Sequence, residues 1–148
     1  MKDIKVLLVD DEEEFVKALA ERIKMRDLAS SVALDGEEAL KLVKNEIPDV
    51  MVLDLRMPGI DGIEVLRRVK KNYPDVQVII LTGHGTEKDE EEARRLGAFE
   101  YLQKPVELDN LIKVIKEAHL SKIQKSMLAT TFAEEGEFKT AKEIMEEG

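Results

Sequence analysis

Short apolar runs alternate with amphipathic segments five times along the chain, and this alternation constrains the fold more than any other feature. Four runs have the length and flanks of buried parallel strands: residues 4–9, 49–55, 76–81 and 99–103. A fifth run, at 29–35, is less apolar and is expected to form an edge strand. Because parallel strands need crossover connections, the pattern predicts an α/β fold with a doubly wound five-stranded parallel sheet and right-handed crossovers.

Segments with helical periodicity separate these runs. The first carries Phe15, Leu19 and Ile23 at three-to-four spacing and continues to Met25, after acidic residues that favour a helix N-terminus. Four further segments have the same periodicity: one after Gly36, one around 63–70, one at 86–96 and one around 108–115. Gly97 is expected to end the fourth of the five helices.

The composition limits the class of protein. The chain of 148 residues suffices for one domain, and 43% hydrophobic residues suffice for a core. A net charge of −9 argues against a nucleic-acid-binding surface, and the lack of cysteine excludes disulfides and thiolate metal sites. No apolar stretch approaches the length of a membrane span or a secretory signal. We therefore expect an acidic, cytoplasmic protein.

Polar residues stand where four of the predicted strands end. Asp10 and Asp11 follow the first strand, Asp54 lies near the end of the third, Thr82 follows the fourth and Lys104 follows the fifth. In an open parallel sheet, ligands bind outside the carboxyl ends of the strands. The sequence therefore predicts that three carboxylates, a hydroxyl and an ammonium group meet at one edge.

This set of groups suits phosphoryl transfer to an aspartate. Clustered carboxylates favour Mg²⁺, which prefers oxygen ligands and offsets their mutual repulsion. A carboxylate can also attack phosphorus, and a dication with a lysine can stabilise the transition state. Each residue alone has a purely structural interpretation: Asp11 as a helix N-cap, Thr82 as a loop residue and Lys104 as a solvent-facing side chain. Their joint placement favours the functional one.

The chain from about Ile4 to Ala118 resembles the receiver domain of bacterial two-component response regulators. The resemblance rests on the acidic pair Asp10-Asp11 and on three motifs in the right order, "LDLRMPGIDGIEVLR", "ILTGHG" and "YLQKP". It implies a flavodoxin-like (β/α)5 fold in which the strands, numbered along the chain, have the order 2-1-3-4-5.

The resemblance also implies roles for the residues at the strand ends. Asp54 would accept a phosphoryl group from a phosphohistidine of a sensor histidine kinase or a histidine phosphotransfer protein. Asp10, or more strongly Asp11, would hold Mg²⁺, and Asp54 and the main-chain carbonyl of Arg56 would complete the protein ligands. Lys104 would pair with the phosphoryl group, and the bond before the following proline is often cis in the family.

Thr82 and Tyr101 match the switch pair of the family. Phosphorylation would draw the threonine hydroxyl to a phosphoryl oxygen and turn the aromatic ring inward, which would repack the face of the fourth helix, fifth strand and fifth helix. Arg56 and His84 fall at positions that tune the lifetime of the acyl phosphate in the family. A plain exposed loop histidine is an equal interpretation of His84.

The alternation of strands and helices stops near His119. We expect a receiver domain over residues 1–119 and a helical extension over 120–148, broken at Gly136. The extension is interpreted as a continuation of the fifth helix plus a short docking or fraying helix, in which Phe138, Ala141, Ile144 and Met145 could share one face. A partner-binding hairpin is the alternative.

The extension is acidic and lacks a helix-turn-helix pattern, so a direct transcriptional output is not expected unless the chain was trimmed from a longer protein. The simplest interpretation is a stand-alone receiver that binds an output protein not named by the sequence or relays phosphate. Phosphorylation-dependent homodimerisation stays open.

Other functions fit the residues less well. A Mg²⁺-dependent phosphatase of the haloacid dehalogenase type needs a second aspartate two positions after the nucleophile, where Arg56 stands. A flavodoxin would not place the acidic "DDEEE" where FMN phosphate binds. A constitutive, non-phosphorylated receiver-like scaffold would not need all five functional positions intact.

Overall fold

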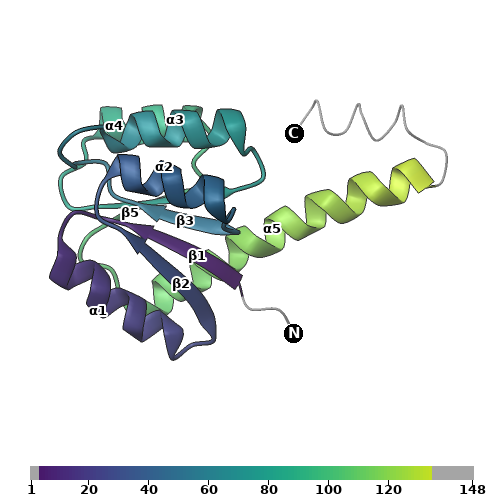
Figure 1. Ribbon diagram of the computed structural model, residues 1–148. Helices are drawn as coiled ribbons and strands as arrows, with labels where there is room; N and C mark the ends of the chain where they lie inside the picture. Colours follow the sequence, from purple (N-terminus) through teal and green to yellow (C-terminus); the bar gives the residue numbers. More distant parts are fainter. Residues whose placement is uncertain (1–3, 135–148) are drawn as a thin grey trace.

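Five parallel strands form one sheet with the order β2-β1-β3-β4-β5 (Figure 1). The computed structural model describes residues 4–134, with the side chains of residues 4–128. The strands are β1 (Ile4–Val9), β2 (Leu28–Ala33), β3 (Val50–Leu53), β4 (Gln77–Thr82) and β5 (Glu100–Gln103). The helices are α1 (Glu13–Lys24), α2 (Gly36–Asn45), α3 (Gly62–Asn72), α4 (Glu87–Arg95) and α5 (Leu108–Glu134). The predicted fold class and strand order are confirmed.

Two apolar cores lie on opposite faces of the sheet. Successive side chains of a strand point to opposite faces, so in β1 Leu7 and Val9 enter one core while Val6 and Leu8 enter the other. Helices α2, α3 and α4 cover the first core, and α1 and α5 cover the second (Figure 1). Burial on both faces explains why the central strands are apolar throughout.

Three helices begin with side-chain caps. Asp35 accepts a hydrogen bond from the backbone N–H of Glu38 at the start of α2, and Asp61 accepts one from Glu64 at the start of α3. Helix α4 begins at Thr86 with a reciprocal capping box, in which Thr86 and Asp89 exchange side-chain-to-backbone hydrogen bonds. These caps fix the helix starts that face the carboxyl ends of the strands.

The observed bounds differ from the predicted ones by one or two residues. Strand β3 ends at Leu53, so Asp54 lies just beyond the strand rather than inside it. Strand β4 continues to Thr82, which is its last residue. In α1 the predicted continuation to Met25 is wrong, because Met25 follows the helix and its side chain is 85% exposed. Gly97 has a φ of +103° after α4, as expected for a helix-ending glycine.

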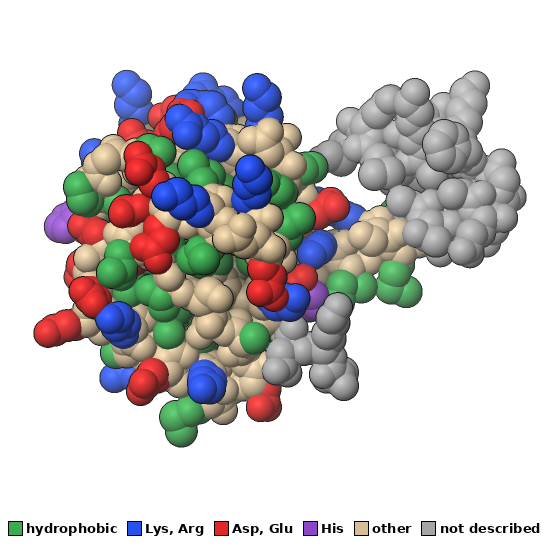
Figure 2. All heavy atoms as spheres, viewed as in Figure 1, with side chains coloured by type: hydrophobic (Ala, Val, Ile, Leu, Met, Phe, Trp, Pro, Cys, Tyr) green, Lys and Arg blue, Asp and Glu red, His purple; other side chains and the backbone are tan. Residues whose placement is uncertain are grey.

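Helix α5 continues well past the predicted domain and projects beyond the sheet (Figures 1 and 2). Along this projection four large apolar side chains are exposed, namely Leu120, Ile123, Met127 and Leu128. The continuation of the fifth helix past residue 119 is thus observed. The predicted break at Gly136 and the face formed by Phe138, Ala141, Ile144 and Met145 lie outside the described residues.

Membrane crossing would require a helix that is both long and apolar, and the described part of the chain contains none.

Candidate functional site

Asp10 and Asp54 lie side by side because their strands are neighbours. In the parallel pair β1–β3, Val9 is paired with Leu53, so the next residue of each strand comes to the same edge. The backbone N–H of Asp54 donates to the carbonyl of Val9 at 3.0 Å. Both aspartates are only 4% exposed. The sheet therefore holds two carboxylates in a nearly buried position at its carboxyl edge.

Lys104 follows the edge strand β5 and reaches both aspartates at the carboxyl edge of the sheet. Its Nζ donates to Asp10 Oδ2 at 2.6 Å and lies 3.8 Å from Asp54 Oδ2. The same Nζ donates to Glu12 Oε1 at 3.1 Å and stands 4.4 Å from the centroid of the Phe15 ring. The backbone N–H of Lys104 bonds to the carbonyl of Thr82, and the following bond to Pro105 is cis, as expected.

Charge in this cluster is unevenly compensated. Burial raises the pKa of Asp10, although hydrogen bonds from Lys104 and from the backbone N–H of Glu12 act in the opposite direction. Burial alone would lower the pKa of Lys104, but its hydrogen bonds to Asp10 and Glu12 outweigh burial and raise it. Three carboxylates share one ammonium group here, so their hydrogen bonds favour the charged form of Lys104 but do not fully offset the burial of Asp10.

The same carboxylates form a candidate metal site. Asp10, Glu12 and Asp54 each offer an oxygen, and these oxygens all lie within 4.8 Å of one another. An all-carboxylate set fits Mg²⁺, and a bound dication would offset the burial and, to a smaller extent, the charge of Asp54 that raise the pKa of Asp10. The donor chemistry therefore fits the predicted ion.

The four predicted metal residues are not all brought together. Asp11 is exposed, and its carboxylate is not part of the group of three. Arg56 follows Asp54 closely, and its backbone N–H donates to Asp54 Oδ1 at 3.3 Å. Glu12 was missed by the sequence analysis. The sequence signal that could have found it is the third acidic residue of "DDE". The orientation of the Glu12 side chain, however, depends on the turn before α1, where Asp10 Oδ1 accepts a hydrogen bond from the Glu12 N–H at 2.8 Å.

The alternative interpretation of Asp11 as a helix cap is not supported. The N-cap of α1 is Glu12, and no side chain caps this helix start.

Thr82 and Tyr101 are neighbours on β4 and β5. Thr82 is fully buried, and its Oγ1 accepts a hydrogen bond from the His84 N–H at 3.4 Å. The Tyr101 ring is turned inward and 7% exposed, and its hydroxyl has no hydrogen-bond partner among the described residues. A Cβ on Gly85 would lie 1.5 Å from that hydroxyl and 2.9 Å from the methyl group of Thr82. The absence of a side chain at Gly85 thus makes room for the tyrosine.

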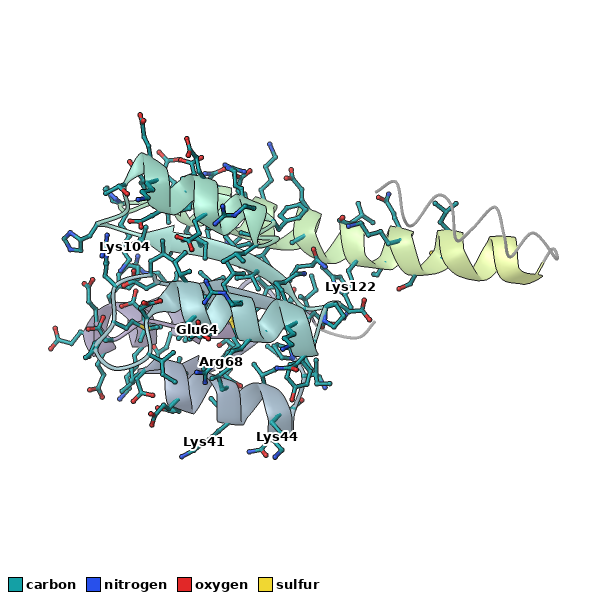
Figure 3. The ribbon with its side chains drawn as sticks, turned by 90° about the horizontal axis from the view of Figure 1, so that it is seen from above. Lys41, Lys44, Glu64, Arg68, Lys104 and Lys122 are labelled. Atoms are coloured by element: carbon teal, nitrogen blue, oxygen red, sulfur yellow. The ribbon has the colours of Figure 1, made fainter. Side chains whose placement is uncertain are left out.

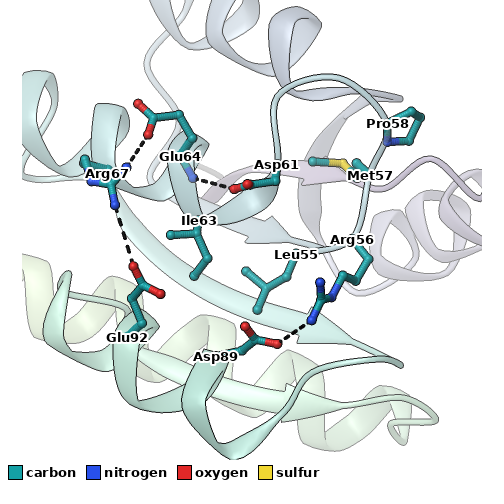
Figure 4. Close-up of a pocket in the computed structure, with 10 residues that line it drawn as sticks. All are labelled: Leu55, Arg56, Met57, Pro58, Asp61, Ile63, Glu64, Arg67, Asp89 and Glu92. Atoms are coloured by element: carbon teal, nitrogen blue, oxygen red, sulfur yellow. Dashed lines mark hydrogen bonds and ion pairs between the residues drawn. The ribbon is translucent and has the colours of Figure 1, made fainter.

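A pocket of about 620 Å³ opens beside this site (Figure 4). It lies between the loop that follows Asp54, the start of α3 and the first turns of α4. Two ion pairs cross it, one between Arg56 and Asp89 and one between Arg67 and Glu92. His84, the other predicted modulator, is exposed in the loop before α4.

Comparisons with known proteins point to one family. The family model described as the response regulator receiver domain matches residues 6–116. An NtrX-like response regulator of Rickettsia felis is 36% identical over 120 residues, which are 80% of this chain and 25% of that protein. The alkaline phosphatase synthesis transcriptional regulatory protein PhoP of Bacillus subtilis is 39% identical over 101 residues, 68% of this chain and 42% of that protein.

Among solved structures, a response regulator receiver domain protein from Clostridium thermocellum superposes with a TM-score of 0.78 at 33% identity. The match covers 82% of this chain and 98% of that one. The chain spans only about a quarter of the NtrX-like relative, but it spans nearly the whole of this solved domain. By sequence and by fold, the chain belongs to the response regulator receiver domain family, a family of signalling modules rather than conventional enzymes.

Proposed function

We propose that the protein is a phosphorylation-activated signalling switch that accepts a phosphoryl group on Asp54 in a Mg²⁺-dependent reaction. The observation that carries the proposal is the placement of Asp54. Its carboxylate is 4% exposed, lies 3.8 Å from Lys104 Nζ and belongs to the group of three carboxylates with Asp10 and Glu12. A nucleophile, a cation and a candidate metal site are therefore in contact.

The reaction is an in-line displacement at phosphorus. One carboxylate oxygen of Asp54 attacks the phosphorus of a phosphohistidine, the new P–O bond forms as the P–N bond breaks, and the donor imidazole leaves after taking up a proton. Lys104 is placed to move from Asp10 toward the transferred oxygens, since its Nζ already lies between the two aspartates. Bound Mg²⁺ would neutralise the carboxylates and the phosphoryl oxygens.

We assign the metal ligands to Asp10, Asp54, Asp11 and the main-chain carbonyl of Arg56. Glu12 joins this set as a candidate because its carboxylate belongs to the observed group. Asp11 needs to turn toward the group on metal binding, which its exposed position allows.

The output would come from Thr82 and Tyr101. Thr82 is placed at the end of β4, with its hydroxyl able to turn toward a phosphoryl oxygen on Asp54. Tyr101 of β5 borders the same space at Gly85 as the methyl group of Thr82, so a shift of the threonine would change the packing of the face formed by α4, β5 and α5. This face is proposed as the surface that changes partner binding, including a second copy of the chain.

The receiver family implies a sensor kinase as partner. We propose a sensor histidine kinase or a histidine phosphotransfer protein as the donor, and residues 1–119 as the unit that receives the phosphoryl group. Residues 120–148 would then be an extension that carries the output or joins it to a partner.

Intact-mass measurement tests the proposal. Incubation with Mg²⁺ and acetyl phosphate should add one phosphoryl group to the wild type, and none when EDTA replaces Mg²⁺. Asp54→Asn should stay unmodified, whereas Asp75→Asn, an aspartate outside the site, should be modified like the wild type.

A constitutive scaffold is the competing function. It predicts no adduct with acetyl phosphate or with beryllofluoride, together with no binding of Mg²⁺. That pair of results would overturn the switch.

A further inference from the structure

Arg56 joins the loop after Asp54 to the first turn of α4. Its guanidinium donates to Asp89 Oδ2 at 2.8 Å across the pocket shown in Figure 4. The carboxylate is the more protected partner, with 22% of its side chain exposed against 55% for the arginine. One ion pair therefore connects two elements that are 33 residues apart in the chain.

Asp89 is also the residue that closes the capping box of α4. Its Oδ2 accepts the backbone N–H of Thr86 at 3.0 Å, and its own N–H donates to Thr86 Oγ1 at 3.1 Å. The Thr86 hydrogen bonds lower the pKa of Asp89 against the effect of burial, and Arg56 lowers it further. A single ionised oxygen thus serves both the helix cap and the arginine.

The start of α4 is consequently held from two sides. On one side, three residues connect the N-cap Thr86 to Thr82 at the end of β4. Tyr101 packs over this short connection at Gly85. On the other side, Arg56 holds Asp89 from the loop that begins at Asp54.

Phosphorylation of Asp54 would place a second anionic group beside Arg56, which would compete with Asp89 for the guanidinium. The backbone N–H of Arg56 already donates to Asp54 Oδ1, so the two residues are in direct contact. A phosphoryl group brings a charge of about −1.5 to −2 and three acceptor oxygens, and a guanidinium binds such a group in a bidentate manner.

We propose that Arg56 is a positioning residue that acts through Asp89. In the unphosphorylated protein the Arg56–Asp89 pair holds the first turn of α4, and a phosphoryl group on Asp54 withdraws the guanidinium and releases that turn. The second half of this inference rests on the proposed function, whereas the first half concerns the unphosphorylated protein alone.

The pocket offers a matched control. Arg67 of α3 lies 3.7 Å from Glu92 of α4, so it also joins α4 to a neighbouring element across the same pocket (Figure 4). This pair is remote from Asp54 along the chain and does not touch the capping box. Its loss should leave the first turn of α4 unchanged.

Amide hydrogen exchange over residues 86–90 tests the proposal. The wild type, Arg56→Gln, Asp89→Asn and Arg67→Gln are compared before and after treatment with Mg²⁺ and acetyl phosphate, and intact mass reports the adduct in each sample. Asp89→Asn keeps an oxygen for the Thr86 N–H but loses the charge. Before treatment, Arg56→Gln and Asp89→Asn should exchange about two- to fivefold faster than the wild type, as loss of one exposed ion pair allows.

After treatment, the wild type should reach the exchange rate of Arg56→Gln, which should change little further, and Arg67→Gln should behave like the wild type. The proposal is overturned if untreated Arg56→Gln exchanges as slowly as the wild type or if Arg67→Gln has the same effect. It is also overturned if fully phosphorylated wild type keeps slow exchange. Missing adduct in the mass spectrum would instead contradict the proposed function, while the untreated samples still decide the role of the ion pair.

Discussion

At the scale of single residues, the contacts of Lys104 and Asp10 show that the negative charge of the site is only partly compensated. Lys104 faces the carboxylates of Asp10, Glu12 and Asp54, so one positive charge compensates three negative ones. Burial and the nearby Asp54 raise the pKa of Asp10 despite its short hydrogen bond to the lysine. Ionisation of Asp10 in the metal-free site therefore costs more than it would in water, and a bound cation would offset this cost, which is the behaviour expected of a metal site.

Asp10→Asn should stabilise the metal-free protein. The asparagine keeps an oxygen for the Glu12 N–H and removes a poorly compensated buried charge. We expect the Tm measured in EDTA to rise by about 2–4 °C, the change that ~1 kcal/mol produces in a domain of this size. The exposed Glu12→Gln is the control and should change Tm less. A lower Tm for Asp10→Asn would mean that the Lys104 contact outweighs burial.

The strand-end residues were the predictable part of the site. The common position of Asp10, Asp54, Thr82 and Lys104 at one edge could be predicted because parallel strands bring their carboxyl ends to one edge whatever the details of packing. Glu12 and Asp89 could not, since their positions depend on how a loop turns and how a helix is capped. The contact between Arg56 and Asp89 could not be predicted either, because the two residues are 33 positions apart and no regular spacing in the sequence relates them.

At the scale of elements, the turn from β3 to α3 holds Asp54 in place. The N–H of Gly62, the first residue of α3, donates to the carbonyl of Leu55 at 3.0 Å. A Cβ at Gly62 would lie 2.3 Å from the carbonyl oxygen of Asp54 and 2.5 Å from the Cα of Leu55. Helix α3 can approach the backbone of Asp54 this closely only because position 62 has no side chain.

Gly62→Ala should therefore be strongly destabilising. The added methyl group meets backbone atoms, which cannot move aside as a side chain does, so we expect a loss of about 2–4 kcal/mol in the free energy of unfolding. Gly83→Ala is the matched control, because its Cβ would find its nearest neighbours, atoms of Lys104, at 3.8 Å. Urea denaturation measures both. Equal stability of the two variants would refute the close approach.

Apart from the end of α5, the element bounds were predictable to within one or two residues, and these small differences have physical causes. The apolar run 49–55 extends beyond β3 because Leu55 is buried without being part of the strand. Met25 has the right spacing for the buried face of α1, but the helix has already ended. Regularly spaced apolar residues indicate which side chains are buried, whereas backbone hydrogen bonding decides where a helix or strand ends.

At the scale of the whole molecule, the two ends of the sheet have separate roles. Lys104 lies at the carboxyl end with the site, and Lys122 lies at the opposite end on the projecting part of α5 (Figure 3). Lys122 Nζ donates to Asp49 Oδ1 at 2.9 Å, and the Lys5 N–H donates to Asp49 Oδ2 at 2.9 Å. Asp49 thereby ties β1, the start of β3 and α5 together away from the chemistry.

Lys122→Gln should weaken this attachment in a pH-dependent way. Burial would raise the pKa of Asp49, but hydrogen bonds from the Lys5 N–H and Lys122 outweigh it and lower the pKa. A lowered folded-state pKa means that the pair stabilises the protein above the unfolded pKa of about 3.9 and that this stabilisation is lost as pH falls through the folded value.

The variant should thus be less stable than the wild type at pH 7, by up to ~1 kcal/mol, and the difference should shrink below about pH 4. Thermal unfolding from pH 3 to 7 measures it. Lys113→Gln removes a more exposed helical pair with Glu117 and should have little effect. A difference for Lys122→Gln that is independent of pH would contradict the role of the Asp49 carboxylate.

The whole fold followed from the alternation of strands and helices because each crossover leaves little choice of topology. The continuation of α5 past residue 119 was also expected, but its projecting part leaves large apolar side chains exposed instead of packing them against the sheet. Its function depends on what it contacts, which local sequence does not specify.

The most direct test of the central claim is to locate the phosphoryl group on the chain. The protein is treated with Mg²⁺ and acetyl phosphate, reduced with borohydride, which converts an acyl phosphate of aspartate to homoserine, and sequenced by tandem mass spectrometry. We predict homoserine at position 54 and aspartate at positions 10 and 11, with no conversion in EDTA. Conversion at Asp10 or Asp11, or an adduct that does not depend on Mg²⁺, would contradict the assignment of Asp54 as the phosphoacceptor.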